Sequence, residues 1–237
     1  MRKPKMIIFD AGRTLIDYAS FDTRKGVNAL MPYITVNPRG LCAEEIDRQT
    51  SKVFEMFEAS REQLFEVPEQ TILRLVHDLL GLEFSIPLAE IERIIWEEDA
   101  VKVPIPHADQ VLEYLHAAGI QTAVLSNLDF SGYLLKEALD ELYPGNHFKF
   151  VIASSDYGIR KPNPLIFQAA IAKSGFCAGD IWYVGDKLAV DVAGSTNAGM
   201  VSVLYKFPRN HYEAIPEGLM IMEDFRDLLK LIDQADS

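Results

Sequence analysis

The sequence predicts an α/β protein in which helices cover both faces of a parallel sheet and a helical block follows the first strand. Three observations lead to this prediction. A short apolar run at residues 5–9 is followed by Asp10, residues 18–100 show apolar side chains at helical spacing, and from residue 101 short apolar runs alternate with helical patterns. Alternating strands and helices are typical of a parallel sheet covered on both faces.

The first strand is predicted at residues 5–9, a buried apolar run that ends at Asp10. Residues 18–100 contain no convincing strand pattern. Their apolar residues recur at helical spacing in three groups, and Gly81 is a plausible C-terminal stop for the second group. The groups are Ile46, Val53, Phe54, Phe57, Leu64 and Phe65; Ile72, Val76, Leu79 and Leu80; and Leu88, Ile91, Ile94 and Ile95.

Beyond Pro104 and Pro106 the pattern alternates between helix and strand. A helix around Val111 ends at Gly119, and further helices are predicted at 132–141, 165–173, 189–198 and 225–232. Strands are predicted at 120–125, 148–152, 181–184, 201–204 and 220–222. The expected organisation is therefore one α/β core domain formed by residues 1–17 and 101–237, interrupted by a helical domain at residues 18–100.

The composition narrows the range of partners. The chain has 237 residues, of which 49% are hydrophobic and 24% charged, as in an ordinary soluble globular protein. Its formal net charge of −12 argues against nucleic acid or an anionic membrane as the main partner. A small anionic substrate remains compatible, because the charge of one site can differ from that of the whole surface.

The two cysteines, Cys42 and Cys177, do not make a disulfide scaffold in a chain of this size, so a reducing compartment is the simpler expectation. The apolar run near the N-terminus is interrupted by Asp10, which is too early for a signal-peptide core. No apolar run approaches the roughly 20 residues that span a bilayer. We therefore expect a cytoplasmic protein.

Polar side chains follow four of the predicted strands, and open parallel sheets bind ligands beyond the carboxyl ends of their strands. The candidates at this edge are Asp10 and Thr14 after the first strand, Ser126 and Asn127 after the second, Lys161 after the third, and Asp186 and Asp191 after the fourth. Each of these short motifs is common in turns. Their occurrence together, in order and each beyond a strand, indicates a shared site.

This set of residues suits phosphoryl chemistry assisted by Mg²⁺. Carboxylate oxygens are the hard ligands that Mg²⁺ prefers. Lys161 would neutralise phosphate charge, and the hydroxyls of Ser126 and Thr14 would donate hydrogen bonds to phosphate oxygens. One aspartate would attack phosphorus and form an aspartyl phosphate.

The four segments resemble the four motifs of the haloacid dehalogenase (HAD) superfamily. They are IIFDAGRTL at 7–15, VLSN at 124–127, RKP at 160–162 and VGDKLAVD at 184–191, and the small-residue stretch 192–200 is also similar to the family pattern. The resemblance implies a Rossmann-like, doubly wound core, a helical cap inserted after the first motif, Mg²⁺, and phosphatase activity on a small phosphorylated metabolite.

The resemblance also implies roles for single residues. Asp10 would be the nucleophile and a Mg²⁺ ligand, Ser126 would bind the phosphoryl group, and Lys161 would hold nucleophile and phosphate together. Asp186 would hold Mg²⁺ directly or through water, and Asp191 would support the metal site or Lys161. Thr14 would brace the loop after Asp10. The remaining candidates for the substrate site are Asn127, Gly12 and Arg13, and the backbone carbonyl of Gly12 would be a further metal ligand.

Gly12 departs from the family pattern, because family phosphatases carry there a second aspartate that acts as general acid and base. Such help is typically worth about 10²–10⁴-fold in rate. Three interpretations remain open: a phosphatase whose acid comes from elsewhere; a phosphonatase or dehalogenase type of hydrolase; or a phosphate- and metal-binding sensor or regulatory protein with weak turnover. The intact Asp186 disfavours dehalogenation. Arg13 also departs from the usual glycine. We expect it to face solvent or to pair with a carboxylate of the helical domain; the alternative is that it adds positive charge at the mouth of the site.

Overall fold

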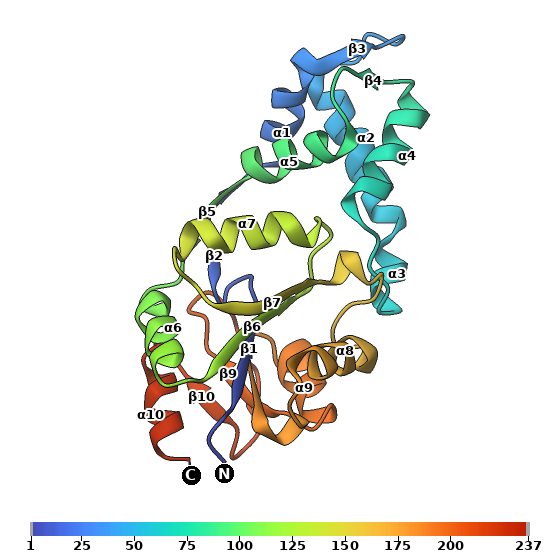
Figure 1. Cartoon of the computed structure of the whole chain (residues 1–237). Coiled ribbons are helices and arrows are strands. Elements are labelled where there is room, and N and C mark those ends of the chain that lie inside the picture. The colour runs from blue at the N-terminus through green and yellow to red at the C-terminus, as the bar shows by residue number, and fades with distance from the viewer. Residues whose placement is uncertain (1, 236–237) are drawn as a thin grey trace.

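The computed structural model describes residues 2–235 and contains a six-stranded parallel sheet with helices on both sides (Figure 1). The strands are β1 (Met6–Phe9), β6 (Gln121–Ser126), β7 (Phe148–Ala153), β8 (Ile181–Gly185), β9 (Val201–Tyr205) and β10 (Met220–Met222). Their order is β10-β9-β8-β1-β6-β7. The chain therefore builds the sheet outward from β1, first to one edge through β6 and β7 and then to the other edge through β8, β9 and β10. This arrangement confirms the predicted α/β fold with a doubly wound parallel sheet.

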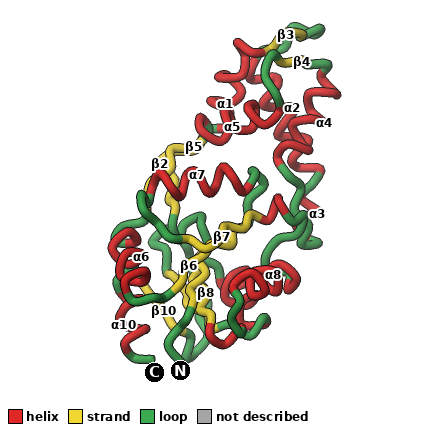
Figure 2. The backbone as a smooth tube through the Cα atoms, in the orientation of Figure 1, coloured by secondary structure: helices red, strands yellow, loops and turns green. Residues whose placement is uncertain are grey.

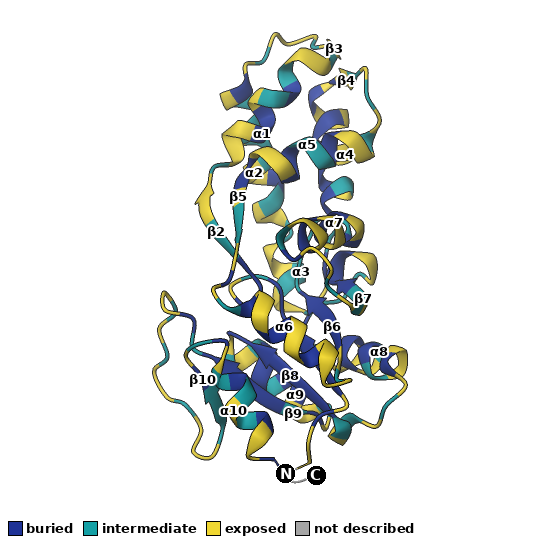
Figure 3. Ribbon diagram, turned by 60° about the vertical axis from the view of Figure 1, so that its left-hand side comes forward, coloured by how far each residue is buried: buried dark blue, intermediate teal, exposed yellow. Residues whose placement is uncertain are grey.

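The two faces of the sheet are packed because side chains alternate along each strand. Ile7 and Phe9 of β1 belong to one apolar cluster, whereas Met6 and Ile8 belong to the other. The helices α6 (Ala108–Ala117), α7 (Gly132–Leu142) and α10 (Asp227–Asp233) contribute to the first cluster, and α8 (Pro164–Ser174) contributes to the second. Figure 3 shows that β8 and β9 are buried between these layers.

Residues 18–100 form mostly helices, as predicted, and they lie above the carboxyl ends of the sheet strands (Figure 1). Their inner faces form two apolar clusters. The first helix was not predicted; the side chain of Asp22 caps it by accepting a hydrogen bond from the backbone N–H of Arg24. The helices are α1 (Thr23–Leu30), α2 (Ala43–Met56), α3 (Glu58–Glu62), α4 (Glu69–Leu80) and α5 (Leu88–Glu98).

The prediction that this region contains no strand is wrong. β2 (Ile16–Phe21) pairs antiparallel with β5 (Ala100–Pro104), and β3 (Ile34–Val36) pairs with β4 (Glu83–Phe84). These strands are short and partly exposed, so they lack the continuous apolar run of a buried strand. Each exists because of a partner distant in sequence. Figure 2 shows that β2 and β5 form the ribbon that joins the helices to the sheet.

The predicted helix at 189–198 is also different. The chain first makes one π-helical turn, η4 (Leu188–Val192), in which the N–H of Val192 donates to the carbonyl of Lys187. The α-helix α9 (Ala193–Asn197) follows. The wide turn leaves the Asp191 side chain buried beside Gly185, where a Cβ on the glycine would lie only 2.5 Å from the Asp191 carboxyl carbon.

The structure also describes both cysteines and the lengths of the helices. Cys42 and Cys177 are both free and exposed. Within residues 2–235, every helix is too short or too polar to cross a membrane.

Candidate active site

The carboxyl ends of β1, β6 and β8 bring three of the predicted residues to one edge of the sheet. Asp10 follows β1, Ser126 is the last residue of β6, and Asp186 follows β8. β1 pairs in parallel with both β6 and β8, so the three strand ends are neighbours. Asp10, Ser126 and Asp186 are all buried, and the first two line a small pocket of about 60 Å³.

Lys161 lies at the centre of the site. Its Nζ donates hydrogen bonds to Asp10 Oδ1 at 2.8 Å and to Asp191 Oδ1 at 2.7 Å. A third hydrogen bond goes to the hydroxyl of Tyr183 at 2.7 Å. Asn127 holds the backbone of Lys161 on both sides, because its amide accepts from Lys161 N–H at 2.7 Å and donates to Lys161 O at 2.9 Å. The lysine is therefore fixed between two carboxylates.

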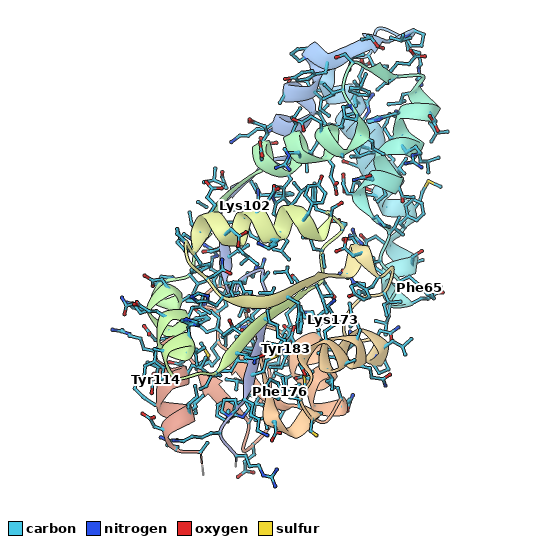
Figure 4. The ribbon with its side chains drawn as sticks, in the orientation of Figure 1. Phe65, Lys102, Tyr114, Lys173, Phe176 and Tyr183 are labelled. Atoms are coloured by element: carbon cyan, nitrogen blue, oxygen red, sulfur yellow. The ribbon has the colours of Figure 1, made fainter. Side chains whose placement is uncertain are left out.

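The charge state of the lysine follows from these neighbours. Burial alone would lower the pKa of Lys161, but Asp10 and Asp191 raise it well above its usual range. The ammonium group is therefore retained in the interior. Burial raises the pKa of the Tyr183 hydroxyl, so this group acts as a neutral hydrogen-bond partner. It donates in turn to the backbone carbonyl of Leu125 at 2.8 Å. Figure 4 shows Tyr183 deep in the core, under the sheet edge that carries the site.

Three carboxylates could hold a metal ion: Asp10, Asp186 and Asp191 each offer an oxygen, and these oxygens lie within 4.8 Å of one another. Both oxygens of Asp191 are occupied by protein groups, Oδ1 by Lys161 and Oδ2 by the N–H of Lys187 at 3.0 Å. Asp186 differs, because its Oδ1 is buried and has no hydrogen-bond partner within residues 2–235. An unpartnered buried carboxylate oxygen is costly unless a cation binds it.

The residues therefore fit a divalent cation on two grounds. The donor set consists of oxygens, as Mg²⁺ and Ca²⁺ prefer. Burial, together with repulsion from the charges of Asp10 and Asp191, raises the pKa of Asp186 to about 6. A bound cation would offset this repulsion. Lys161 offsets part of this repulsion but is directed at Asp10 and Asp191, which leaves Asp186 as the acidic group with unused coordination capacity.

Gly12 and Arg13 lie at the mouth of the site. An added Cβ at Gly12 would contact only Tyr18, whose ring edge and hydroxyl both lie 3.9 Å away. Arg13 has a positive φ of 60° and donates from Nη1 to Asn210 Oδ1 at 3.0 Å. Asn210 in turn donates to Asp186 Oδ2 at 2.6 Å. The unusual arginine is thus connected to the candidate metal site through one amide side chain.

The structure separates Thr14 from the other predicted residues. Thr14 is fully buried beneath the loop after Asp10, where its Oγ1 has no hydrogen-bond partner within residues 2–235, and it does not line the pocket. The loop is wound around the carbonyl of Ala11, which accepts the N–H groups of Thr14, Leu15 and Ile16. The position of Thr14 suits support of this loop and not contact with substrate.

Three residues around the site were not found from the sequence: Tyr183, Asn210 and Tyr18. The alternation of side chains along the strand before Gly185 could have indicated Tyr183, because this residue faces the same side of the sheet as Met6 and Ile8 of the neighbouring strand. Asn210 belongs to the loop after β9 and carries no recognisable motif. Tyr18 lies on β2, a strand that the sequence pattern did not reveal.

Comparison with known proteins identifies the family. The family model described as "haloacid dehalogenase-like hydrolase" matches residues 4–199, which is most of the chain. The chain belongs to this family. It is thus a HAD-like hydrolase, as the four motifs had indicated.

Several characterised proteins and solved structures are similar to this HAD-like hydrolase. It is 26% identical to glyceraldehyde 3-phosphate phosphatase of Methanopyrus kandleri over 204 residues, covering 84% of this chain and 82% of that protein. It is 24% identical to phosphoglycolate phosphatase 1 of Pseudomonas aeruginosa over 237 residues, covering 99% and 82%. The crystal structure of a 2-haloacid dehalogenase from Pseudomonas syringae pv. Tomato superimposes with a TM-score of 0.67 at 19% identity, covering 99% of both chains. The last likeness concerns the fold alone.

Proposed function

We propose that this protein is a Mg²⁺-dependent phosphatase that hydrolyses a small phosphate monoester through an aspartyl phosphate on Asp10. The observation that carries the proposal is the arrangement of Lys161 between Asp10 and Asp191, with Asp186 Oδ1 nearby and without a hydrogen-bond partner in the described part of the chain. The names of the phosphatase relatives from Methanopyrus kandleri and Pseudomonas aeruginosa support the same reaction class.

The proposed mechanism begins with attack on phosphorus by a carboxylate oxygen of Asp10. Asp10 Oδ1 is held by Lys161, which leaves Oδ2 as the attacking atom. The bond between phosphorus and the leaving oxygen breaks, and the alkoxide takes up a proton from solvent water. A second water then attacks phosphorus and releases a proton to solvent, the acyl phosphate bond breaks, and phosphate leaves while the Asp10 carboxylate is restored. Lys161 and Ser126 would contact the transferred phosphoryl oxygens.

A divalent cation would be held by Asp10, Asp186 and the backbone carbonyl of Gly12. When bound, such an ion neutralises phosphate charge and orients the ester for in-line attack. Asp191 would contribute by fixing Lys161 and the N–H of Lys187, since both of its oxygens are already engaged.

The leaving group needs a proton, and Gly12 offers no carboxyl group for this purpose. The hydroxyl of Tyr18 lies 3.9 Å from where a side chain at Gly12 would begin. Burial and the charge of Asp10 raise the pKa of Tyr18 to about 12. This phenol can donate a hydrogen bond to the leaving oxygen, but it is a poor proton donor near neutral pH. We therefore expect turnover slower than in family members that carry an aspartate here.

The experiment is an assay of phosphate release from a panel of phosphate esters with and without Mg²⁺, including glyceraldehyde 3-phosphate and phosphoglycolate. We expect Mg²⁺-dependent turnover that Asp10→Asn abolishes. The control Asp109→Asn changes an exposed carboxylate on α6 and should retain full activity. Absence of turnover in the unmodified protein, together with equal phosphate binding by Asp10→Asn, would refute the enzyme and favour the sensor interpretation.

We further propose that residues 18–100 act as a cap on a core formed by residues 1–17 and 101–237, and that the protein works in the cytoplasm. The β2–β5 ribbon between helices and sheet supports the first proposal. The two exposed free thiols, Cys42 and Cys177, support a reducing compartment.

A further inference from the structure

A large cavity extends from the candidate active site into the helical region. Its volume is about 810 Å³, which is within the range of pockets that hold drug-sized ligands. Tyr18, Trp96 and Leu128 line both this cavity and the small pocket around Asp10. A molecule whose phosphate lies at Asp10 would therefore project its other end into the cavity.

The walls of the cavity are mainly apolar. Phe54 of α2, Leu73 of α4, Ile95 of α5 and Phe130 of the core are among the side chains that line it. Apolar surface of this extent in contact with water is unfavourable, and burying it against an apolar ligand is favourable. A leaving group that carries only hydroxyl groups or a carboxylate would not bury the apolar side chains of these walls.

The charged groups in the cavity are unevenly distributed. Its two guanidinium groups are already engaged: Arg13 donates to Asn210, and Arg209 is paired with Asp17. His77 also lines the cavity, and burial lowers its pKa to about 4, so this imidazole is uncharged near neutral pH. The acidic residues along the wall are Asp47, Glu55, Glu69, Asp99 and Asp129.

Glu69 differs from these other carboxyl groups because it is deeply buried and has no side-chain partner among residues 2–235. Asp129 accepts from Arg61 at 2.8 Å, and Asp99 accepts from the N–H of Gly26 at 2.9 Å. Glu69 is only 3% exposed, lines the cavity, and within residues 2–235 its carboxyl has neither a hydrogen bond nor an ion pair. Burial, reinforced by Asp129, raises the pKa of Glu69 well above its usual range and favours the neutral acid when no cation lies beside it. A cation bound beside the carboxyl group would lower this pKa and stabilise the carboxylate. The carboxyl oxygens of Glu69 are not enclosed by protein atoms but border the cavity, so a group of a bound ligand would be a suitable partner for them.

We propose that the substrate is a phosphate monoester with a bulky apolar leaving group that carries an ammonium group, and that Glu69 pairs with this ammonium inside the cavity. The proposal rests on the proposed phosphatase function and specifies its substrate class. The apolar body would fill the walls, the phosphate would lie at Asp10, and the cation would supply the partner that Glu69 lacks. Charge-assisted pairing in a desolvated cavity favours such a ligand over its neutral analogue.

The test is a series of four esters with the same type of primary alkoxide leaving group, so that their intrinsic reactivity is matched. They are ethyl phosphate, 2-phenylethyl phosphate, and the 2-phenylethyl esters with a para aminomethyl or a para carboxyl group. We expect kcat/KM to rise about ten-fold from the ethyl to the phenylethyl ester and about ten-fold again to the aminomethyl ester. The carboxyl ester should be the poorest of the three aromatic substrates.

The variant Glu69→Gln preserves shape and removes the charge. It should reduce the ratio of kcat/KM between aminomethyl and neutral esters to about one, with circular dichroism verifying the fold. The matched control Asp78→Asn changes an exposed carboxylate on the same helix, α4, outside the cavity and should keep the ratio. The same ranking is expected for binding of the four esters to Asp10→Asn, measured by calorimetry.

The outcomes separate the two proposals. Hydrolysis of all four esters at equal kcat/KM would overturn the substrate class and leave the phosphatase function standing. An aminomethyl preference that survives Glu69→Gln would overturn the role of Glu69. If no ester is hydrolysed, the phosphatase function is refuted, and the affinities of Asp10→Asn for the four esters test the ligand class. Equal affinities for all four would overturn the proposed ligand class.

Discussion

At the scale of single residues, Lys161 determines how the site is organised. A lysine buried without partners would lose its charge, yet this one keeps it because two carboxylates and a phenol surround the ammonium group. Lys161 engages one oxygen of Asp10 and one of Asp191, whereas the buried Asp186 Oδ1 has no hydrogen-bond partner within residues 2–235, as a metal ligand would require. The three aspartates therefore differ in how many of their oxygens are available to a ligand.

Gly12 provides the first prediction at this scale. If the missing carboxyl limits an otherwise intact site, Gly12→Asp should raise kcat by about ten-fold, the conservative end of general acid–base catalysis. The structure has room for the substitution, because an added Cβ would meet only Tyr18 at 3.9 Å. The measurement is kcat for the best ester of the panel. The size-matched control Gly12→Asn should give no increase; an equal gain in both variants would show that the added volume, not the acid, matters.

At the scale of elements, the contact between α1 and α5 contains a buried carboxyl group, Asp99, whose charged form is disfavoured by its surroundings. Asp99, at the C-terminal end of α5, accepts the N–H of Gly26 in α1 and is only 7% exposed. A Cβ at Gly26 would lie 2.4 Å from Asp99 Oδ1, so only glycine permits this approach. Burial raises the pKa of Asp99 to about 7, and the nearby charges of Asp47 and Asp22 add to the effect.

This raised pKa predicts how stability changes with pH. Between the unfolded pKa of 3.8 and the folded pKa of about 7, the folded state binds more protons, so stability should fall as pH rises through this range. At about 1.4 kcal/mol per pKa unit the loss is at most about 4 kcal/mol. Asp99→Asn keeps the oxygen that accepts from Gly26 and should reduce the pH dependence of the free energy of unfolding.

Urea unfolding of the unmodified protein and of Asp99→Asn at pH 5 and pH 8 measures this difference. Asp78→Asn, on the exposed side of α4, serves as the control. The assignment of the pH dependence to Asp99 is wrong if the two substitutions give the same difference in stability between pH 5 and pH 8.

At the scale of the whole molecule, buried carboxylates of the helical region attach it to the core. Glu92 of α5 accepts the N–H and the hydroxyl of Ser131 at 2.7 and 2.9 Å, and Glu66 accepts the hydroxyl of Ser154 at 2.6 Å. Phe65, at the base of the helical region in Figure 4, forms a bridge with Ile159. These contacts join the helical region to the core, and Trp96 of α5 lines both the cavity and the pocket around Asp10, so the helical region helps to define the proposed binding space.

Metal binding should be visible as stabilisation of the whole molecule. A ligand present at 100 times its Kd stabilises the folded state by about 2.7 kcal/mol, which corresponds to roughly 5–10 °C in Tm for a chain of this size. We expect Mg²⁺ to raise Tm of the unmodified protein by this order and to have little effect on Asp186→Asn. Scanning calorimetry with and without Mg²⁺ is the measurement. Equal shifts in both proteins would exclude Asp186 as a ligand.

The sequence by itself determined the sheet, most of the helices and the residues that follow the strands. These features depend on local patterns: apolar alternation or helical spacing, and short motifs at strand ends such as those of Asp10, Ser126 and Asp186. The β2–β5 ribbon, the π-helical turn before α9 and the hydroxyl of Tyr183 were not predicted. The ribbon depends on pairing between segments distant in sequence, and the turn depends on two backbone hydrogen bonds, from Val192 to Lys187 and from Ala193 to Leu188, that no side-chain pattern indicates.

Only the tertiary structure decided which atoms of the site are free and which are occupied. The motifs place three aspartates at the site but do not show which of their oxygens are engaged. Lys161 and the N–H of Lys187 satisfy both oxygens of Asp191, whereas Asp186 Oδ1 has no hydrogen-bond partner among residues 2–235. The cavity beyond them, whose wall includes Glu69, forms where helices from one part of the chain face loops from another. Such a space has no local sequence pattern, because burial and distance between remote residues are properties of the folded chain.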